Sequence, residues 1–526
     1  MSTRGVKLSR RGFLGLTAAG ALVAGAGLAG CSSQEPKAAT ASDEAEGYTP
    51  GTIVETIDTD IVVVGLGMSG LSAAVQAANN GDAVVGIEAT GVTGGNGIGV
   101  EGIFAVGTDM QKKAGIEIEP VEVVQTELEE AQMVTDGALW KKLVQSSADN
   151  VSWLMEQGVQ FSGVVDDYLG SGIVSGFHWF EGNIASEGYI PQMTQRAEEL
   201  GVDMRFNTPA KALITENGKV VGVFAHNQDG DDIQINAKAV ILATGGYAQN
   251  QKFMEERGFN WENIVYGGTP GHNGDGLTMA LEAGARSFVK NSTFNCTNII
   301  GQGDTFAWKA DSFTSTFCGA GMFGTGGNQL WVNQDADRFI NENFAAANFE
   351  MQSVPAMTQR VMYTVFDRAI LESSLANDPD TIKRVDDAKE ADLAVADTLA
   401  EAAEQLGLDA EALQASVDRY NELCKTGVDA DFGKPAELMV PIENPPFYVG
   451  KLNQYYLMSV GGIECNINAQ VIDESKTPIE GLYAVGTDGC MLYRNIYTIN
   501  VGGTCNANNI NSGRTAANHA HSVIAG

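Results

Sequence analysis

Basic residues and regularly spaced cysteines are scarce in this sequence of 526 residues. Lys and Arg number 32 against 66 Asp and Glu, so the formal net charge is −34. An acidic surface of this kind excludes nucleic acid and anionic lipid headgroups as direct partners; it favours solubility, or else docking to a basic redox protein. The seven Cys contain no C-x-x-C pair, which excludes a zinc site or iron–sulfur cluster of the usual spacing. C-x-x-C-H is also missing, so any haem must be carried by a partner.

The glycines, by contrast, are abundant, and the chain is organised around a first group of them. Ile61–Val64 is apolar and β-branched, which predicts a buried parallel strand. Gly65, Gly67 and Gly70 then form a G-x-G-x-x-G turn that leads into an Ala-rich helix over 71–80, a second strand over 83–87 and an acid, Glu88. Such a turn alone also occurs in ordinary loops, but this order of elements predicts a dinucleotide site with its pyrophosphate at the helix N-terminus.

The start of the chain predicts export. Arg10 and Arg11 stand before an apolar run over 16–30, and Leu28–Cys31 resembles a bacterial lipobox. We therefore expect a twin-arginine lipoprotein signal over 1–31, a lipid anchor on Cys31 and a position on the extracytoplasmic face of the cell membrane. The alternative is a membrane anchor with a chance Cys. Residues 32–54 are poor in apolar side chains and predict a disordered tether.

The body of the chain contains further glycine-rich segments beside regular elements. A second loop follows at 93–102, and 120–160 is predicted to be helical with Trp140 and Trp153 in the core. Apolar and polar residues alternate over 202–239, with turns at 217–218 and 229–230, which predicts a meander of hairpins. A buried strand follows over 239–246. Gly271–Gly276 opens a helix whose N-terminus also predicts a contact with the ligand.

Together these motifs resemble the FAD-dependent oxidoreductases of the fumarate reductase and succinate dehydrogenase flavoprotein group, which includes urocanate reductases and 3-ketosteroid dehydrogenases. The resemblance covers about residues 55–525 and includes Arg338–Glu342, Val460–Gly462 and Gly481–Gly486. It implies an α/β fold in which a Rossmann-like FAD-binding domain is interrupted by an α+β capping domain. The implied boundaries are 55–282 and 445–526 for the FAD-binding domain and 283–444 for the cap.

The resemblance also implies which residues hold the cofactor. Ser69 and Gly70 would face the diphosphate and Glu88 the ribose, while a C-terminal helix would begin near the flavin C2 carbonyl. The acid that usually follows Gly486 is replaced by Thr487, with Asp488 next. No His occurs in the loop that carries it in covalently flavinylated members, so we expect non-covalent FAD. The full predicted set is Gly65, Gly67, Ser69, Gly70, Glu88, Gly95, Asn96, Gly97, Gly102, Ala210, Gly245, Asp275, Gly486, Thr487, Gly503, Cys505 and Asn506.

The residues expected to act on substrate depart from the fumarate reductase pattern. Ala346 stands where the family carries its proton-donating Arg, and neither of the two positions at which the family carries a His has one here. The position of the carboxylate-binding Arg is Asn500, and Arg494 is the possible substitute. A dicarboxylate needs paired Arg forks, so fumarate is excluded as substrate. Aromatic residues replace them; the alternative is that these are packing residues whose hydroxyl groups are paired. The predicted catalytic set is Arg494, Tyr493, Tyr497 and Tyr456, whereas His178 and His272 are interpreted as structural.

Three functions are compatible with these features. The first is an extracytoplasmic reductase of the C=C bond of an α,β-unsaturated acid or ketone, fed by a membrane-bound cytochrome or flavin carrier. The second is the reverse reaction, a dehydrogenase of a steroid-like ketone. The third is a flavin lipoprotein that relays electrons without turnover. The G-x-G-x-x-G spacing recurs, as at Gly97–Gly102, but no second strand–turn–helix–strand unit ending in an acid is there for a nicotinamide cofactor, which favours an external electron donor.

Overall fold

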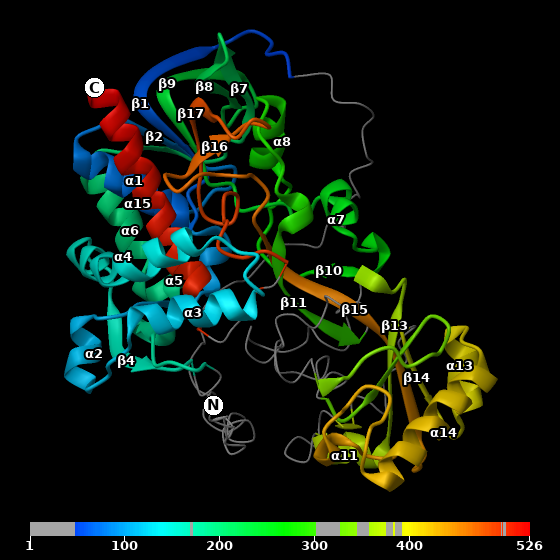
Figure 1. The fold of residues 1–526 in the computed structure, drawn as a ribbon. Coiled ribbons are helices and arrows are strands. Elements are labelled where there is room, and N and C mark those ends of the chain that lie inside the picture. The colour runs from blue at the N-terminus through cyan, green and yellow to red at the C-terminus, as the bar shows by residue number, and fades with distance from the viewer. Residues whose placement is uncertain are drawn as a thin grey trace.

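The computed structural model describes residues 48–168, 172–300, 327–343, 357–374, 382–383, 392–495, 497 and 501–526, without the side chains of 295–297. The predicted signal therefore lies outside the described residues. Three β-sheets and the helices around them form two unequal parts, which Figure 1 shows at the upper left and the lower right. Within the described residues, no helix combines the length and apolar character that crossing a bilayer requires.

The largest sheet contains the predicted dinucleotide-binding strands. Its order is β16-β17-β9-β1-β2-β6, and the β7–β8 hairpin joins it through β9. β1 pairs in parallel with β2, Ile61 opposite Val84, and with β9, Ile61 opposite Ala239. The strands are β1 (Glu55–Val64), β2 (Val84–Ile87), β6 (Asp203–Arg205), β7 (Ala210–Glu216), β8 (Lys219–His226), β9 (Asp232–Leu242), β16 (Gln470–Ile472) and β17 (Pro478–Ala484).

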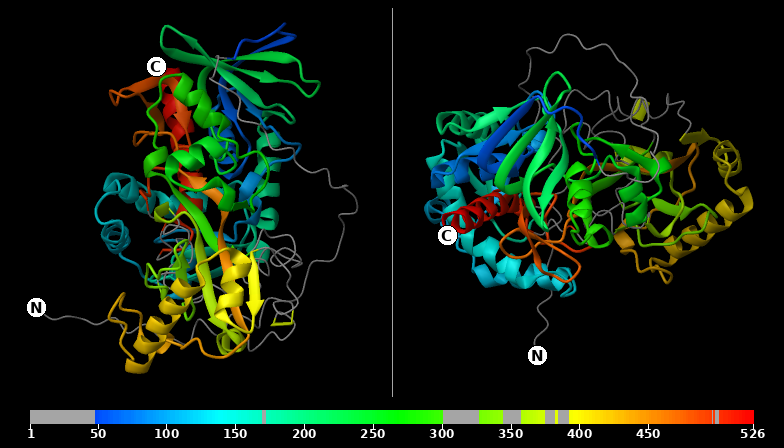
Figure 2. Two further views of the ribbon diagram at one scale, coloured as in Figure 1. Left: turned by 90° about the vertical axis from the view of Figure 1, so that its right-hand side faces the viewer. Right: turned by 90° about the horizontal axis from the view of Figure 1, so that it is seen from above.

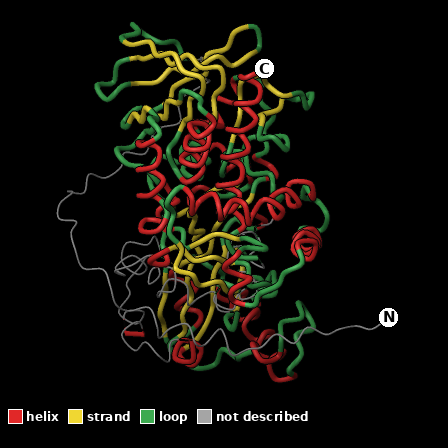
Figure 3. The backbone as a smooth tube through the Cα atoms, turned by 90° about the vertical axis from the view of Figure 1, so that its left-hand side faces the viewer, coloured by secondary structure: helices red, strands yellow, loops and turns green. Residues whose placement is uncertain are grey.

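β9 differs from its prediction, because the last hairpin strand and the buried strand are one continuous element. Its first half pairs antiparallel with β8 over 232–236, while its whole length pairs in parallel with β1. The side-chain pattern changes from alternating to fully buried at Ala239, where the strand leaves the hairpin and enters the centre of the sheet. Figures 1 and 3 place β7 and β8 at the end of the molecule that carries the C-terminus.

Alternate residues of β1 face two separate apolar cores. Ile61 and Val63 pack against the side that carries α1 (Met68–Asn80), α4 (Gly137–Glu156), α6 (Ile190–Glu199) and α15 (Thr504–Ala525). Val62 and Val64 pack against the side formed by the hairpin with α7 (Gln251–Arg257) and α8 (Asp275–Glu282). Trp140 and Trp153 lie in the first core, as predicted, and the helical region over 120–160 is confirmed as α3 (Pro120–Glu130) and α4.

The second sheet builds the other part of the molecule. Its order is β10-β15-β13-β12, with β11 and β14 also paired to the long strand β15. Figure 2 shows this part beside the first from two further directions. Its elements are β10 (Ile264–Tyr266), β11 (Thr293–Ile300), β12 (Leu330–Asn333), β13 (Met362–Asp367), α11 (Arg368–Ser374), β14 (Leu393–Ala396), α13 (Leu399–Leu406), α14 (Ala410–Thr426) and β15 (Phe447–Val460).

A small third sheet lies against the N-terminus of α15. It has the order β3-β5-β4 and pairs Gly102 with Trp179. The backbone N–H of Phe104 donates to the carbonyl of Gly503 at 3.1 Å, which fixes the sheet to the start of α15. Its strands and the neighbouring short helices are β3 (Gly102–Phe104), β4 (Phe161–Asp166), β5 (Phe177–Phe180), α2 (Asp109–Ala114) and α5 (Ala185–Gly188).

Candidate functional site

The first glycine turn is shaped by close backbone packing on one side and is open on the other. A side chain at Gly65, where φ is +97°, would collide with the carbonyl of Ala243, and one at Gly70 would collide with the carbonyl of Gly65. At Gly67 the nearest atom to an added Cβ is the carbonyl oxygen of Gly94, at 3.6 Å. Gly67 also begins α1 without a side-chain cap, so its open side exposes unpaired N–H groups.

Glu88 follows β2 and holds this turn. Its carboxylate accepts from the Leu66 N–H at 2.8 Å, and from the N–H and hydroxyl of Thr90 at 2.9 and 2.8 Å. Its own carbonyl accepts from the N–H of Thr208, two residues before Ala210 begins β7. This hydrogen bond ties the end of β2 to the segment that leads into β7, and the ribose contact of Glu88 and the adenine contact of Ala210 stay predictions.

The second glycine loop packs directly on the first. Gly94 donates its N–H to the carbonyl of Leu66 at 2.9 Å, and Gly97 lies against Met68 of α1. Asn96 binds protein atoms: it donates to the carbonyl of Leu457 at 2.7 Å and accepts from the N–H and hydroxyl of Thr269. Asn96 thus ties this loop to β15 and to the segment after β10, a role that sequence reasoning did not identify.

A third group of segments meets at Asp488, which is 1% exposed. Its carboxylate accepts from the N–H and hydroxyl of Thr244 and from the N–H of Gly246. The Thr244 hydroxyl in turn accepts from the N–H of Gly276 at 3.2 Å, in the first turn of α8, where Asp275 is exposed. Gly245 is also needed here, because a side chain at its φ of +92° would meet the ring of His272.

The C-terminal segment returns to both glycine turns. A side chain at Gly486 would collide with the hydroxyl of Ser69 in the first turn of α1, and the carbonyl of Thr487 accepts from the Gly461 N–H at 2.8 Å. Gly503 begins α15 with a φ of +80° and no side-chain cap. Asn506 donates to the carbonyl of Gly102 at 3.1 Å. Predicted positions more than 400 residues apart thus surround the N-termini of α1 and α15.

The two glycine turns, the segments that meet at Asp488 and the N-termini of α1, α8 and α15 form a cradle, and this cradle fits FAD. Asn509 lies beside Gly486, and its buried side-chain oxygen has no hydrogen-bond partner among the described residues. The open side of Gly67 leaves room for a pyrophosphate against the backbone, and the N-termini of α1, α8 and α15 offer N–H groups for negative charge. A bound dinucleotide would supply hydrogen-bond partners for the unpaired Asn509 oxygen and for the free N–H groups at these helix N-termini.

Three of the four predicted catalytic residues are deeply packed. Tyr493 is 2% exposed, its hydroxyl is paired with Thr504, and burial raises its pKa. Its ring meets those of Trp140 and Tyr497 edge-on, at 5.5 and 4.8 Å between centroids. Tyr456 is fully buried between Phe259 and Phe294. These contacts are those of packing residues, and the Tyr493 hydroxyl also contacts Thr504, the first residue of α15.

Arg494 is the predicted catalytic residue with hydrogen-bonding capacity to spare. It is half-buried, its guanidinium lies over the ring of Phe288 at 5.6 Å, and Nη1 donates to the carbonyl of Val134 at 3.4 Å. Nε is buried without a partner among the described residues. An unpaired guanidinium N–H is costly unless a ligand accepts from it.

Sequence reasoning missed a carboxyl group beside the start of α15. Glu101 is half-buried, directly before Gly102, and accepts from the hydroxyl of Tyr168; burial raises its pKa. The ring of Tyr168 stacks on Trp179 at 5.9 Å and lies 4.7 Å from Phe177. An added Cβ at Gly502 would lie 2.8 Å from Cβ of Tyr168. The available signal was an acid inside a glycine-rich ligand loop.

Comparisons with known proteins agree with this geometry. The family model described as an FAD binding domain matches residues 60–500. The chain is 30% identical over 488 residues to vinyl phenol reductase of Lactiplantibacillus plantarum, covering 88% of this chain and 96% of that protein. It is also 30% identical to urocanate reductase of Eggerthella lenta, over 82% of this chain and 70% of that protein.

Solved structures share the fold. The open conformation of a flavocytochrome c3 fumarate reductase matches with a TM-score of 0.63 and 25% identity, covering 90% of this chain and 79% of that one. The 3-ketosteroid-Δ4-(5α)-dehydrogenase of Rhodococcus jostii matches with a TM-score of 0.64 and 22% identity, over 89% of this chain and 98% of that one, which shows the fold alone. The chain therefore belongs to the FAD-binding domain family, and it is an FAD-dependent oxidoreductase.

Proposed function

We propose that the chain is an exported reductase of the C=C bond of an α,β-unsaturated acid or ketone that carries an aromatic or otherwise bulky group. Two features carry this proposal: the rings of Tyr168, Phe177 and Trp179 gather against the start of α15, and Arg494, beside the ring of Phe288, retains an unpaired N–H among the described residues. Aromatic faces favour a flat apolar substrate, and one guanidinium is suited to a single carbonyl or carboxylate oxygen.

A second Arg lies nearby but is engaged. Arg257 donates to the carbonyl of Ser292 at 2.8 Å, to the sulfur of Met357 and to the side chain of Asn495. The guanidinium of Arg257 is thus taken up by protein atoms, whereas Nε of Arg494 has no partner among the described residues. This supports the exclusion of fumarate, whose two carboxylates need paired Arg forks.

When bound, FAD supplies hydride chemistry, which suits delivery to the β-carbon of an activated alkene. Gly67, Ser69, Glu88 and Gly486 would hold its dinucleotide part, and the uncapped N–H groups of α15 would stabilise negative charge at its other end. Nε of Arg494 would donate to the substrate oxygen as charge builds there. The Glu101 carboxyl, whose pKa burial raises, is the proposed proton donor to the α-carbon, and Arg494 or a Tyr is the alternative donor.

The location and electron donor complete the proposal. The Arg pair, apolar run and lipobox at the start of the sequence support export and a lipid anchor on Cys31. The formal charge of −34 supports docking to a basic patch on a membrane-bound cytochrome or flavin carrier. We also propose that residues 283–444 form the mobile cap of the family, because β11 to β14 of the second sheet lie in sequence between the two parts of the chain that build the cradle; β10 and β15 of the same sheet lie outside these bounds.

The decisive experiment screens substrates against the reduced, FAD-loaded protein under anaerobic conditions. A panel of aromatic enoates and enones should reoxidise the flavin, whereas fumarate should not. Arg494→Gln should abolish this reoxidation while FAD stays bound, and Arg419→Gln, at an exposed ion pair with Asp431, should leave it unchanged. Reoxidation by fumarate alone would contradict the proposed substrate class.

Two other functions give different results in the same assay. A ketosteroid dehydrogenase would reduce the flavin with a saturated ketone and pass electrons to an oxidised dye, and the fold shared with such an enzyme favours testing it. A non-catalytic electron relay would show a flavin spectrum that responds to no member of the panel. The relative that is named a vinyl phenol reductase favours the proposed reductase over both.

A further inference from the structure

The backbone before Arg494 is anchored to the start of α4 through one carbonyl group. The carbonyl oxygen of Leu492 accepts a hydrogen bond from the hydroxyl of Thr135 and another, at 2.8 Å, from the indole N–H of Trp140. Thr135 is half-buried in the turn between α3 and α4, and Trp140 is the fourth residue of α4. A carbonyl oxygen has two lone pairs, so two side-chain donors fix this group in direction as well as in place.

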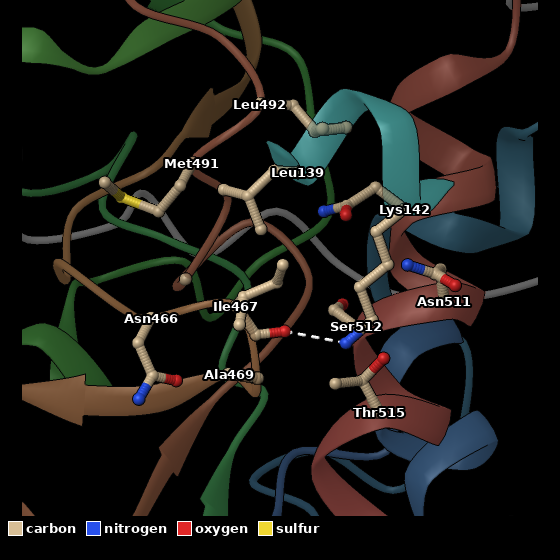
Figure 4. Close-up of a pocket in the computed structure, with 12 residues that line it drawn as sticks. Leu139, Lys142, Asn466, Ile467, Ala469, Met491, Leu492, Asn511, Ser512 and Thr515 are labelled. Atoms are coloured by element: carbon tan, nitrogen blue, oxygen red, sulfur yellow. Dashed lines mark hydrogen bonds between the residues drawn. The ribbon is translucent and has the colours of Figure 1, made fainter. Parts of the chain in front are cut away.

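The side chain of Leu492 is held as well. It is 2% exposed and belongs to the same apolar core as Trp140. Figure 4 shows it, together with Leu139 of α4, among the residues that line a hollow of about 30 Å³. A hollow of this size has room for about one water molecule, so it leaves the Leu492 side chain little freedom to move. Leu492 is therefore a fixed point two residues before Arg494.

The residue after Arg494 is anchored to a different part of the molecule. The N–H of Asn495 donates to the carbonyl of Asn291 at 3.0 Å, and its side-chain oxygen accepts from Arg257 at 3.4 Å. Its φ of +64° lies in the left-handed region, which Asn adopts more readily than most residues. Arg494 thus stands on a short backbone segment that is held at both ends.

The turn that carries Thr135 also contacts the guanidinium directly. Nη1 of Arg494 donates to the carbonyl of Val134 at 3.4 Å, and the guanidinium lies over the ring of Phe288 at 5.6 Å. Nε is buried and has no partner among the described residues. Two neighbouring residues, Val134 and Thr135, therefore hold the head of the Arg494 side chain and the backbone that leads to it.

The same turn has a strained backbone. Gln132 and Met133 are consecutive non-glycine residues with φ values of +52° and +61°. The turn is closed by the N–H of Met133 on the carbonyl of Leu128 at 2.7 Å, and by the N–H of Val134 on the carbonyl of Ala131 at 3.1 Å. Bulky residues keep such a conformation only where their surroundings impose it, so this turn is a rigid support for Val134 and Thr135.

We propose that Thr135 is the positioning residue for Arg494. Its hydroxyl holds the Leu492 carbonyl, and this keeps the guanidinium where Nε can donate to the substrate oxygen. The inference rests on the proposed function, in which Arg494 binds that oxygen, and Thr135 acts through Arg494. A long side chain loses much of its binding energy to rotamer freedom unless it is held in advance, and a small misplacement of the binding group weakens the contact.

The test measures how tightly the FAD-loaded, full-length protein binds cinnamate, an aromatic enoate, from the change in the flavin absorption spectrum. Thr135→Val keeps the size of the side chain but removes the hydroxyl, and it should raise the Kd for cinnamate about tenfold. Thr135→Ser retains the hydroxyl and should bind cinnamate like the unchanged protein. The matched control is Thr126→Val, at a half-buried position of α3, which should also leave the Kd unchanged.

A double-variant cycle separates positioning from a general loss of structure. Arg494→Gln should weaken cinnamate binding by itself, and adding Thr135→Val should weaken it no further, because the group that Thr135 positions is then gone. An unchanged Kd in Thr135→Val overturns the inference, and so does an equal loss of affinity in both backgrounds. In either case the proposed function stands, because Arg494→Gln tests it separately.

Failure of the proposed function gives a different result. If Arg494→Gln leaves the Kd unchanged, or if the unchanged protein binds neither cinnamate nor the enone benzylideneacetone, the proposed function fails and the inference fails with it. Circular dichroism and the FAD content check that each variant is folded. Should Thr135→Val not fold, Thr135→Ala removes the same hydroxyl without adding a methyl group beside the carbonyl, and the same outcomes decide.

Discussion

Asp488 has a structural role directly beside the position where an acid for the cofactor was expected. The sequence places Thr487 where related flavoproteins carry an acid, and the next residue is Asp488. The structure turns the Asp488 carboxylate inward, onto Thr244 and Gly246 at the end of β9. It thereby joins two segments that lie 244 residues apart in sequence, and the C-terminal part of the cradle depends on it.

We expect Asp488→Ala to destabilise the protein and to weaken FAD binding together. The substitution leaves the backbone N–H groups of Thr244 and Gly246 buried without an acceptor, at a cost of about 2–4 kcal/mol in the free energy of unfolding. Urea unfolding and flavin fluorescence measure the two effects. Asp229→Ala, at an exposed hairpin turn, is the control and should change neither.

Because His178 and His272 are buried, we expect the folded protein to lose stability in acid. Burial lowers the pKa of each from 6.5 to about 4. The unfolded chain therefore binds more protons than the folded one between these values, so stability is present above pH 6.5 and falls as the pH drops towards 4. Each ring contributes up to about 1.4 kcal/mol per pH unit in this window.

Equilibrium unfolding as a function of pH checks this expectation. His178→Gln should reduce the slope, because Gln remains neutral while it can still contact Thr108 and the carbonyl of Gly176. His272→Gln should reduce it further, and the two effects should add. An unchanged slope in the double variant would show that other groups take up the protons.

At the scale of elements, local patterns were predictable and long-range ties were not. The strand, glycine turn, helix and second strand over 55–87 follow from residues that are neighbours in sequence, and the structure confirms them. The continuity of β9 was missed because its two halves have different partners and hence different side-chain patterns. The roles of Asn96 and Asp488 depend on partners more than 170 residues away, which no local spacing reveals.

The packing of α15 on α1 gives a prediction for one glycine. An added Cβ at Gly513 would lie 2.5 Å from the carbonyl oxygen of Ser69 and 3.0 Å from the N–H nitrogen of Ala73, so even Ala is too large. We expect Gly513→Ala to lower the free energy of unfolding by about 1–3 kcal/mol, although Ala favours helices more than Gly does. FAD affinity should also fall, since Ser69 lies in the first turn of α1.

Chemical denaturation and FAD titration measure both effects of Gly513→Ala. The matched control is Val523→Ala on the same helix, where the side chain is 56% exposed and its loss should change neither quantity. A gain in stability for Gly513→Ala would mean that the two helices separate easily enough for helix propensity to decide the outcome.

At the scale of the whole molecule, the cradle consists of segments from both ends of the chain, and FAD should hold them together. Removing a ligand that binds only the folded state costs about 4 kcal/mol at a free concentration ~1,000 times its Kd. Hydrogen exchange should therefore rise after FAD removal in residues 65–70, 94–99, 243–246 and 504–509, whose contacts converge on the N-termini of α1 and α15. α14 packs in the separate core of the second sheet and should keep its protection, which makes it the internal reference. Equal loss in α14 would instead mean that the two parts of the molecule unfold as a single cooperative unit, and that the second sheet depends on the cofactor as much as the first.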